Sequence, residues 1–479
     1  MKPFRIFLLL FGIFIVIGLI SIVTKAKGIH IADGFEIRIP SVFDLFHPPA
    51  AEYADITKIS QDDKADSVVA FKTVKPDHPH DSVPHPAINQ FLEYPDSSKR
   101  SLDTFFSMLA EMSPSKECIH ILHYGDSQLE ADRITEYLRF RFQGEFGGNG
   151  PGLLSFNEEA SRTSLQITTS GNWSRFGLFG TPYSQQGKRP YGALASYFRF
   201  TRLQDSLNPV SESKDAWIRI SGAGRSYGKS KQFNRCRVFY ANNHTSTRTT
   251  FLTDDRQMKS DSLPPVNDLR ELDYSFSSAP ANLTIRFSGP DSPDFYGICL
   301  DQPTGISVDN IPLRGSSGLE FTRMNPTLLN GMLHKLNVHL MILQFGVNAI
   351  PGNLPDYSYY ENAFYRQLAF LKKLDPELCI IVIGVSDASQ KVGDVYESYA
   401  SVEKIVAAQR AAAMKAGCVF WNLYEAMGGK NSMPSWVFAK EPLATTDFIH
   451  FNYTGARMVS KMFYSALIHD YNEFLTKKR

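Results

Sequence analysis

The sequence predicts an α/β protein with a parallel β-sheet, which a long all-β segment interrupts and an apolar N-terminal helix precedes. Three observations predict this fold class. Strand-like apolar runs alternate with helical runs on both sides of the middle of the chain, which is typical of a parallel sheet with helices on both faces. Helical periodicity disappears between residues 158 and 300. The chain begins with a long uncharged stretch.

The uncharged stretch, residues 6–24 (IFLLLFGIFIVIGLISIVT), approaches the roughly 20 residues that a helix needs to span a bilayer. A cleavable signal peptide has a shorter apolar region, and the following VTKAKG offers no small-x-small cleavage site. We therefore expect residues 1–27 to form an uncleaved signal anchor, a transmembrane helix, with a cleaved signal peptide as the alternative. The rest of the chain then lies outside the cytoplasm, in the periplasm.

Residues 28–95 are expected to be an extracytoplasmic linker. Their last part, KPDHPHDSVPHP, contains His78, His80 and His85, which could suggest a metal site. The prolines between them prevent a regular element from aligning the imidazoles, so an exposed tether is the favoured interpretation.

The α/β pattern begins near residue 96 with a helical run, the strand CIHILHY and the helix ADRITEYLRFRFQGEFG. It resumes later with the strands LNVHLMILQFG, LCIIVIGV and CVFWNLY, each followed by a helical run. We expect residues 96–157 and 301–479 to be the two parts of one domain. Ligands of such sheets bind beyond the carboxyl ends of the strands.

Residues 158–300 are expected to form an inserted β-sandwich. Short alternating runs such as AWIRISGAG, CRVFYANN and NLTIRFSGP are separated by turns rich in Ser, Asn, Gly and Pro. Four aromatic residues of this segment could stack on sugar rings or belong to a β core: Trp173, Tyr183, Tyr191 and Tyr240.

Composition excludes two classes of function. Fifty basic and 49 acidic residues give a net charge of +1, so the chain lacks the basic footprint of a nucleic-acid-binding protein. The five cysteines contain no C-x-x-C pair, which removes the usual zinc and thioredoxin signatures. Cys118, Cys379 and Cys418 lie at the start of or within apolar strand-like runs, and we interpret them as core residues; the other two are Cys236 and Cys299.

Ser127 lies in HYGDSQLEAD, between the strand that ends near Gly125 and the helical run that follows. It is either a helix N-cap or a nucleophile that a sharp turn exposes, close to a helix N-terminus that favours negative charge. The second interpretation needs a base and an orienting carboxylate. Asp447 and His450, in TTDFIHFNYTGA, supply both groups, although a turn cap and a surface histidine are the alternative.

Two further residues follow predicted strands and could bind an oxyanion. Asn348 comes after LNVHLMILQFG, and Gly315 lies in the loop of NIPLRGSSG. Taken singly, Asn348 is as well explained as a turn former and Gly315 as a hinge. Together with the N–H of Ser127 they make a set of three donors.

Four blocks in this order resemble those of the SGNH/GDSL hydrolase superfamily: Gly-Asp-Ser at 125–127, Gly315, Gly-x-Asn at 346–348 and Asp-x-x-His at 447–450. The resemblance implies a flavodoxin-like three-layer α/β/α domain, no metal or other cofactor, and serine esterase chemistry on acyl esters. It makes Ser127 the nucleophile, His450 the base and Asp447 its partner, with Ser127, Gly315 and Asn348 as oxyanion donors.

Within that superfamily, the β insertion and FGGNGPGLL (residues 146–154) are similar to peptidoglycan O-acetylesterases with a carbohydrate-binding-like module. Gln128 and Ala349 depart from the pattern of many relatives, which leaves the substrate open. The expected function is removal of O-acetyl groups from a cell-envelope polysaccharide such as peptidoglycan. One alternative is a polysaccharide O-acetyltransferase that uses the same site and a membrane acetyl-transfer partner. The other is an inactive glycan-binding envelope protein.

Overall fold

The computed structural model describes residues 52–59 and 88–478, apart from 98–99, 114–115, 158–161, 179–189, 203–212, 225 and 353, together with scattered residues among the first 37. Residues Tyr53–Arg479 form one compact unit and Met1–Glu52 another. In the second of these, β1 (Ile29–Ala32) and β2 (Phe35–Ile37) pair antiparallel.

The predicted transmembrane helix lies mostly outside the described residues, and so do the three histidines of the predicted linker. In the part of the chain that the structure describes, every helix is too short or too polar to cross a membrane. The membrane anchor therefore stays a prediction.

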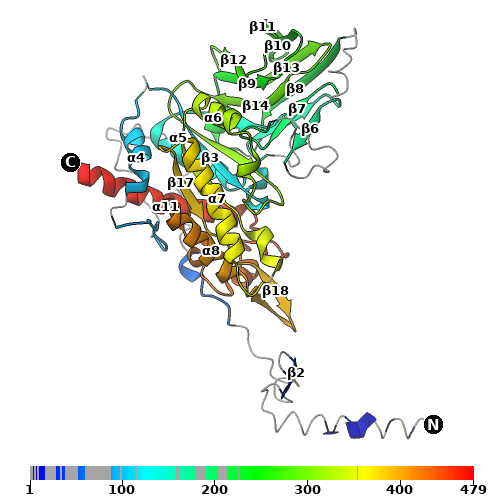
Figure 1. Cartoon of the computed structure of the whole chain (residues 1–479), viewed down its shortest axis with the longest axis vertical. Helices are drawn as coiled ribbons and strands as arrows, with labels where there is room; N and C mark the ends of the chain where they lie inside the picture. Colours follow the sequence, from blue (N-terminus) through cyan, green and yellow to red (C-terminus); the bar gives the residue numbers. More distant parts are fainter. Residues whose placement is uncertain are drawn as a thin grey trace. The chain divides into compact units, whose positions relative to one another are not determined.

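A five-stranded parallel sheet forms the centre of the α/β part (Figure 1). Its strands are β3 (Ile119–Gly125), β15 (Ile306–Pro312), β16 (Val338–Gln344), β17 (Cys379–Ile383) and β20 (Val419–Trp421). They lie in the order β15-β3-β16-β17-β20, so that the first strand along the chain has the second and third as neighbours. This is the strand order of flavodoxin-like sheets, in which ligands bind where the order reverses. Here the reversal lies between β3 and β16.

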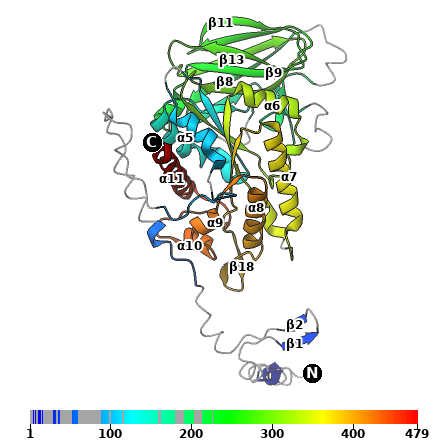
Figure 2. The same ribbon diagram turned by 60° about the vertical axis from the view of Figure 1, so that its left-hand side comes forward.

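Helices cover both faces of this sheet. One face packs against α4 (Asp103–Ala110), α5 (Thr135–Phe146) and α11 (Tyr453–Lys478), and the other against α6 (Pro326–Lys335), α7 (Ser358–Leu374) and α8 (Val402–Lys415). Figure 2 shows α5 beside α11, and α7 beside α8. Because helices lie on both sides, every residue of β3 is buried, which explains the continuous apolar run in the sequence.

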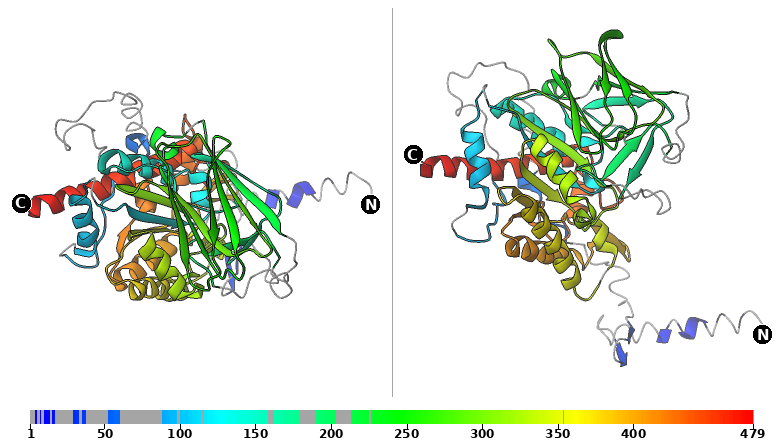
Figure 3. Two further views of the ribbon diagram at one scale, coloured as in Figure 1. Left: turned by 90° about the horizontal axis from the view of Figure 1, so that it is seen from above. Right: turned by 45° about the horizontal axis from the view of Figure 1, so that its top comes forward.

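Two antiparallel sheets form between residues 152 and 301. Their orders are β11-β10-β13-β8-β5 and β12-β9-β14-β7-β6, and β4 pairs with β14. The right-hand view of Figure 3 shows these strands, in green, gathered together. The bounds are β4 Gly152–Leu154, β5 Leu165–Thr169, β6 Ser174–Gly177, β7 Ser196–Arg199, β8 Lys214–Gly222, β9 Arg235–Ala241, β10 Thr247–Thr253, β11 Arg256–Leu263, β12 Arg270–Ser275, β13 Asn282–Gly289 and β14 Asp294–Asp301.

The mixture of a parallel sheet and antiparallel sheets confirms the α/β class with additional β structure. β4 precedes the predicted start of the β segment at residue 158, and it belongs to the same sheet as β14. The bounds of the five segments that the sequence suggested stay predictions.

Aromatic side chains fill the space between the two antiparallel sheets. Trp173 is buried and packs 4.8 Å from Phe156, centroid to centroid, and Tyr240 is buried as well. These two residues therefore belong to the core and not to a sugar-stacking surface. Tyr191 is half-buried, and Tyr183 lies outside the described residues. All five cysteines are buried and free, as a core role predicts.

The structure also contains elements that the sequence analysis did not predict. β18 (Ser389–Val392) and β19 (Val395–Ser398) form a hairpin between β17 and α8. After β20 come the short helices α9 (Leu423–Ala426) and α10 (Ser432–Phe438). The loop that carries Asp447 and His450 lies between α10 and α11.

Candidate active site

Ser127 begins a short 3-10 helix, η2 (Ser127–Asp132), two residues after β3 ends at Gly125. A Cβ atom at position 125 would lie 2.6 Å from the carbonyl oxygen of Gln344, so this turn beside β16 requires a glycine. The carboxylate of Asp126 accepts a hydrogen bond from the N–H of Gln128 at 3.0 Å and so caps η2. The N-cap role that was one interpretation of Ser127 therefore belongs to Asp126.

A kink lies within η2, before α5 begins. Ala131 and Asp132 have φ values of +60° and +65°, and α5 begins only at Thr135. Asp132 is held there by a buried ion pair with Arg139, whose Nη1 lies 2.6 Å from its Oδ2. Ser127 is therefore at the N-terminus of the short helix η2, whereas the longer helix that the sequence predicted after it, α5, begins only at Thr135.

Ser127, His450 and Asp447 form a continuous chain of hydrogen bonds. The Oγ atom of Ser127 lies 2.7 Å from Nε2 of His450, and Nδ1 of His450 lies 2.7 Å from Oδ2 of Asp447. The imidazole is partly accessible, since 29% of the His450 side chain is exposed. The structure thus brings together the three residues that the sequence singled out, in the arrangement that activates a serine hydroxyl.

The turn around Asp447 holds this carboxylate in its ionised form. Its Oδ1 atom accepts hydrogen bonds from the N–H groups of Ile449 and His450, both at 3.0 Å, and from the hydroxyl of Thr445 at 2.7 Å. Partial burial opposes ionisation, but these hydrogen bonds together with that to His450 outweigh it and lower the pKa of Asp447 to about 2. Asp447 is therefore a carboxylate that orients His450 throughout the neutral pH range.

The residue between Asp447 and Ile449 is backbone-strained. Phe448 has a φ of +59°, which a bulky side chain rarely adopts. The ring of Tyr396, in the β18–β19 hairpin, stacks on Phe448 with 3.6 Å between centroids, and the N–H of Ser389 donates to the carbonyl of Phe448 at 3.0 Å. The hairpin therefore fixes the loop that positions Asp447 and His450.

Gln128 connects the turn of Ser127 to the loop of His450. Its buried side-chain amide donates to the carbonyl of Ile449 at 2.7 Å and accepts from the N–H of Phe451 at 3.3 Å. Both partners are direct neighbours of His450. The residue that departs from the pattern of many relatives thus helps to set the distance between the hydroxyl and the imidazole.

The candidate oxyanion donors lie after the two strands that flank β3. Gly315 follows β15, and Asn348 follows β16. The amide of Asn348 donates to the carbonyl of Ser316 at 2.8 Å, which ties the two loops together and leaves its second N–H available. Gly315 is exposed with a φ of +80° and open space around its Cβ position. Among the described residues, the N–H groups of Ser127 and Gly315 have no hydrogen-bond acceptor.

Asp126 contacts both the turn of Ser127 and the segment that carries Asn348. Its buried carboxylate is hydrogen bonded by the backbone of Gln128, Val347 and Gly346. Burial raises the pKa of Asp126 to about 6, although these hydrogen bonds oppose the shift. At neutral pH the ionised side chain thus links the turn of Ser127 to the segment that carries Asn348.

Near the beginning of β3, away from the triad, three possible metal ligands lie close to one another. Ligand atoms of Cys118, His120 and Asp301 lie within 4.8 Å of one another, and all three residues are buried. His120 already bonds Asp309 through Nδ1 at 2.6 Å and Asp301 through Nε2 at 3.1 Å. The guanidinium of Arg237 lies 3.0 Å from the same Nε2 atom, so a fixed positive charge competes with any cation. We interpret the group as a buried ion-pair network, and the absence of a metal cofactor stays a prediction.

Three contributors were not recognised from the sequence as parts of the site: Thr445, Gln128 and Tyr396. Thr445 lies only two residues before Asp447 and donates to its carboxylate, so its contact is local along the chain. Gln128 and Tyr396 act through residues that are far away along the chain, so no local pattern reveals them.

No protein-family model matches the sequence, and no curated protein matches it. A solved structure of a peptidoglycan O-acetylesterase is similar, with a TM-score of 0.62 and 19% identity over 80% of this chain and 99% of that chain.

Two other solved structures are less similar. An acetyl xylan esterase has a TM-score of 0.27 and 19% identity over 34% of this chain and 81% of its own. A protein described as a GDSL-like lipase from Bacteroides ovatus has a TM-score of 0.24 and 11% identity over 64% of this chain and 98% of its own. At 19% identity, the similarity to the peptidoglycan O-acetylesterase concerns the fold. The chain therefore has an SGNH/GDSL hydrolase-like fold, as the sequence blocks predicted.

Proposed function

We propose that the chain is a serine esterase that removes O-acetyl groups from a cell-envelope polysaccharide such as peptidoglycan. The observation that carries this proposal is the chain of two 2.7 Å hydrogen bonds from Ser127 through His450 to Asp447. A serine hydroxyl is a weak nucleophile at neutral pH, and a histidine oriented by a carboxylate is the arrangement that activates it.

In the first half of the reaction, Oγ of Ser127 attacks the acetyl carbonyl carbon while its proton moves to Nε2 of His450. Negative charge then develops on the carbonyl oxygen. The N–H groups of Ser127 and Gly315 and the free N–H of the Asn348 amide stabilise that oxygen. The tetrahedral intermediate collapses by breaking the bond to the sugar oxygen, which takes the proton from His450 and leaves as a hydroxyl. Ser127 is then acetylated.

In the second half, water attacks the acetyl-serine carbonyl and His450 accepts its proton. The second tetrahedral intermediate breaks the bond to Ser127, which recovers its proton from His450, and acetate leaves. Asp447 remains ionised through both halves and stabilises the imidazolium that forms twice. No step requires a metal or an organic cofactor.

Two observations support a glycan ester as substrate over a lipid ester. The fold of this chain is similar to that of a peptidoglycan O-acetylesterase, with a TM-score of 0.62. Ser127, His450 and Asn348 are all at least partly accessible, as a polymeric substrate requires.

The experiment is to measure acetate release from O-acetylated peptidoglycan by the full chain and by Ser127→Ala. We expect steady release by the unchanged protein, and release at the background rate by the variant. Retained release by Ser127→Ala, with correct folding, would refute the mechanism. Failure of the unchanged protein to release acetate from any acetylated envelope glycan would leave the glycan-binding alternative.

The apolar N-terminal stretch favours a second candidate function, transfer of the acetyl group to a sugar hydroxyl by a protein anchored in the membrane. In that case the acetyl-serine is resolved by the sugar in place of water, and a membrane partner supplies the acetyl group. Incubation with an acyl donor and glycan acceptors separates the two functions. Newly acetylated glycan indicates transfer, and free acetate alone indicates hydrolysis. The anchor and the periplasmic location of the site are part of this proposal.

A further inference from the structure

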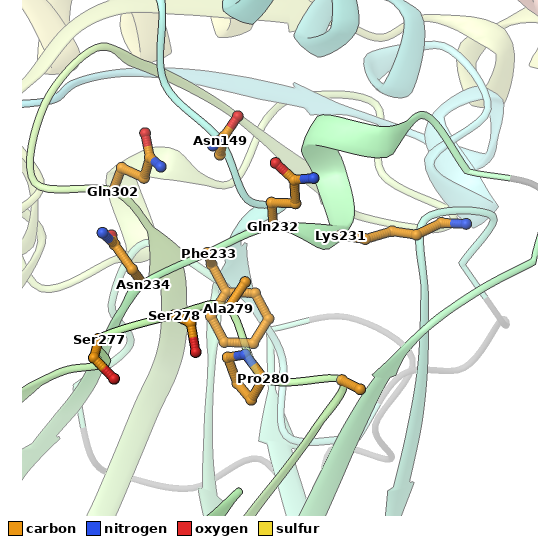
Figure 4. Close-up of a pocket in the computed structure, with 11 residues that line it drawn as sticks. Asn149, Lys231, Gln232, Phe233, Asn234, Ser277, Ser278, Ala279, Pro280 and Gln302 are labelled. Carbon is orange, nitrogen blue, oxygen red and sulfur yellow. The ribbon is translucent and has the colours of Figure 1, made fainter. Parts of the chain in front are cut away.

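A second polar site lies at the opposite end of the parallel sheet. It is a pocket of about 490 Å³, formed by the loop after α5, the segment just before β9, the β12–β13 connection and the residue after β14 (Figure 4). Gln302 lies here, and the carbonyl of its neighbour Pro303 accepts a hydrogen bond from the N–H of Cys118, just before β3 begins. Ser127 follows the other end of β3, and a strand of this length spans about 20 Å.

Four side-chain amides converge on this pocket: Asn149, Gln232, Asn234 and Gln302 (Figure 4). Among the described residues, none of them makes a side-chain hydrogen bond within the chain, and the Oδ1 atom of Asn234 is shielded from solvent without a partner. The situation differs from that of the amides near the triad, since Gln128 and Asn348 are both hydrogen bonded. The pocket therefore presents several unused donors and acceptors in one place.

The rest of the pocket lining offers no charged group to a ligand. Phe233 and Pro280 are buried and form an apolar wall, and the hydroxyls of Ser277 and Ser278 lie beside it (Figure 4). Lys231 is the single charged residue of the lining, and its ammonium points away to donate to the carbonyl of Gly224 at 3.3 Å. Phosphates and acidic chains need cationic partners, which this lining does not provide.

The glycine-rich loop that the sequence analysis singled out holds Asn149 in place. Cβ atoms at Gly148 and Gly150 would lie 2.4 Å from the carbonyl of Ile306 and 2.3 Å from that of Leu300. Both glycines have positive φ values, so this close approach of the two backbones depends on glycine. The loop therefore fixes one amide of the pocket against the end of β14 and the start of β15.

From these observations we propose that the pocket binds a neutral, hydroxyl- and acetamido-bearing sugar unit of a glycan. Amide side chains both donate to and accept from sugar hydroxyls, and they can do the same with the amide of an acetamido group. The inference extends the proposed function, in that one polymer engages this pocket while a distant acetyl group reaches Ser127. Such a second contact raises the effective concentration of polymeric substrate and leaves small esters unaffected.

The test is calorimetric titration of the full chain with an oligomer of β-1,4-linked N-acetylglucosamine. The variant combines Asn149→Ala, Gln232→Ala and Gln302→Ala, and the matched control combines Gln166→Ala and Gln257→Ala, two exposed amides outside the pocket. We expect the variant to bind at least about tenfold more weakly and the control to bind as the unchanged protein does. Equal binding by variant and unchanged protein overturns the proposal, and so does an equal loss in the control.

A second variant, Gln232→Arg, places bulk and charge in the pocket at an exposed position, and we expect the same loss of binding. Steady-state kinetics then separate this proposal from the esterase. The pocket variants are expected to raise KM for acetylated polymer and to keep both kcat and the rate on an aryl acetate. An unchanged KM for polymer contradicts the pocket, whereas an inactive unchanged protein contradicts the esterase. Because the titration needs no turnover, it decides on the pocket in either case.

Discussion

The two ends of the parallel sheet use polar side chains in opposite ways. Beyond the carboxyl end of β3, the side chains of Ser127, His450 and Asp447 are bonded to one another, and neighbouring amides hold them. Near the amino end, the amides of Asn149 and Gln302 converge on a pocket without partners inside the described chain. The difference indicates that one end is built for reaction and the other for binding.

The physical reason for this difference is where the hydrogen-bond partners come from. A reacting group gains most when its partners are fixed before the substrate arrives, since no reorganisation is then needed as charge develops. A binding pocket gains most when its donors and acceptors are left for the ligand. The reactive end should therefore lose activity whenever one of its internal partners is removed.

Removal of the base is expected to have the largest effect. His450→Ala should lower kcat on an aryl acetate by about 10⁴-fold or more, because Ser127 loses the group that accepts its proton. The matched control is His334→Ala, an exposed histidine on α6, which should keep full activity. Activity of His450→Ala within about tenfold of the unchanged protein would show that the chain of hydrogen bonds is not a catalytic triad.

Removal of one oxyanion donor should cost less. Asn348→Ala is expected to lower kcat by about 10²- to 10³-fold, since charge on the carbonyl oxygen loses one N–H donor. Steady-state kinetics with an aryl acetate provide the measurement, and thermal unfolding checks that the loops after β15 and β16 remain in place. A nearly fully active variant would remove Asn348 from the site.

Loosening the contact between the Ser127 turn and the His450 loop should lower the activity less than removal of an oxyanion donor does. Gln128→Ala removes the amide that bonds both neighbours of His450, and we expect kcat to fall about tenfold or more with little change in KM. A readout specific to positioning is the imidazole proton spectrum, in which the hydrogen bond between Ser127 and His450 should weaken. A change in KM alone would instead indicate a role in substrate binding.

The smallest predicted effect concerns stability. Because the folded state lowers the pKa of Asp447 from 3.8 to about 2, the ionised side chain stabilises the fold above pH 3.8, and this contribution is lost as the pH falls toward 2. The difference in unfolding temperature between the unchanged protein and Asp447→Asn should therefore be present at neutral pH and shrink in acid. A difference in unfolding temperature that does not change with pH would show that packing, and not the charge of Asp447, causes it.

The sequence was sufficient for features that depend on nearby residues. The alternation of strands and helices predicted the parallel sheet, because helices on both faces bury every residue of strands such as β3. The Asp-x-x-His spacing predicted that Asp447 reaches Nδ1 of His450, since three residues of one loop suffice for this contact. The transmembrane segment and the domain boundaries remain predictions.

Only the tertiary structure decided how distant segments meet. Ser127 and His450 are 323 residues apart, and their 2.7 Å contact depends on the strand order and on the amide of Gln128. The strained conformation of Phe448 depends on the hairpin that carries Tyr396. Periodicity reports which face of an element is buried, whereas side-chain partners are chosen by the packing of the whole chain, so local pattern predicts elements and not these contacts.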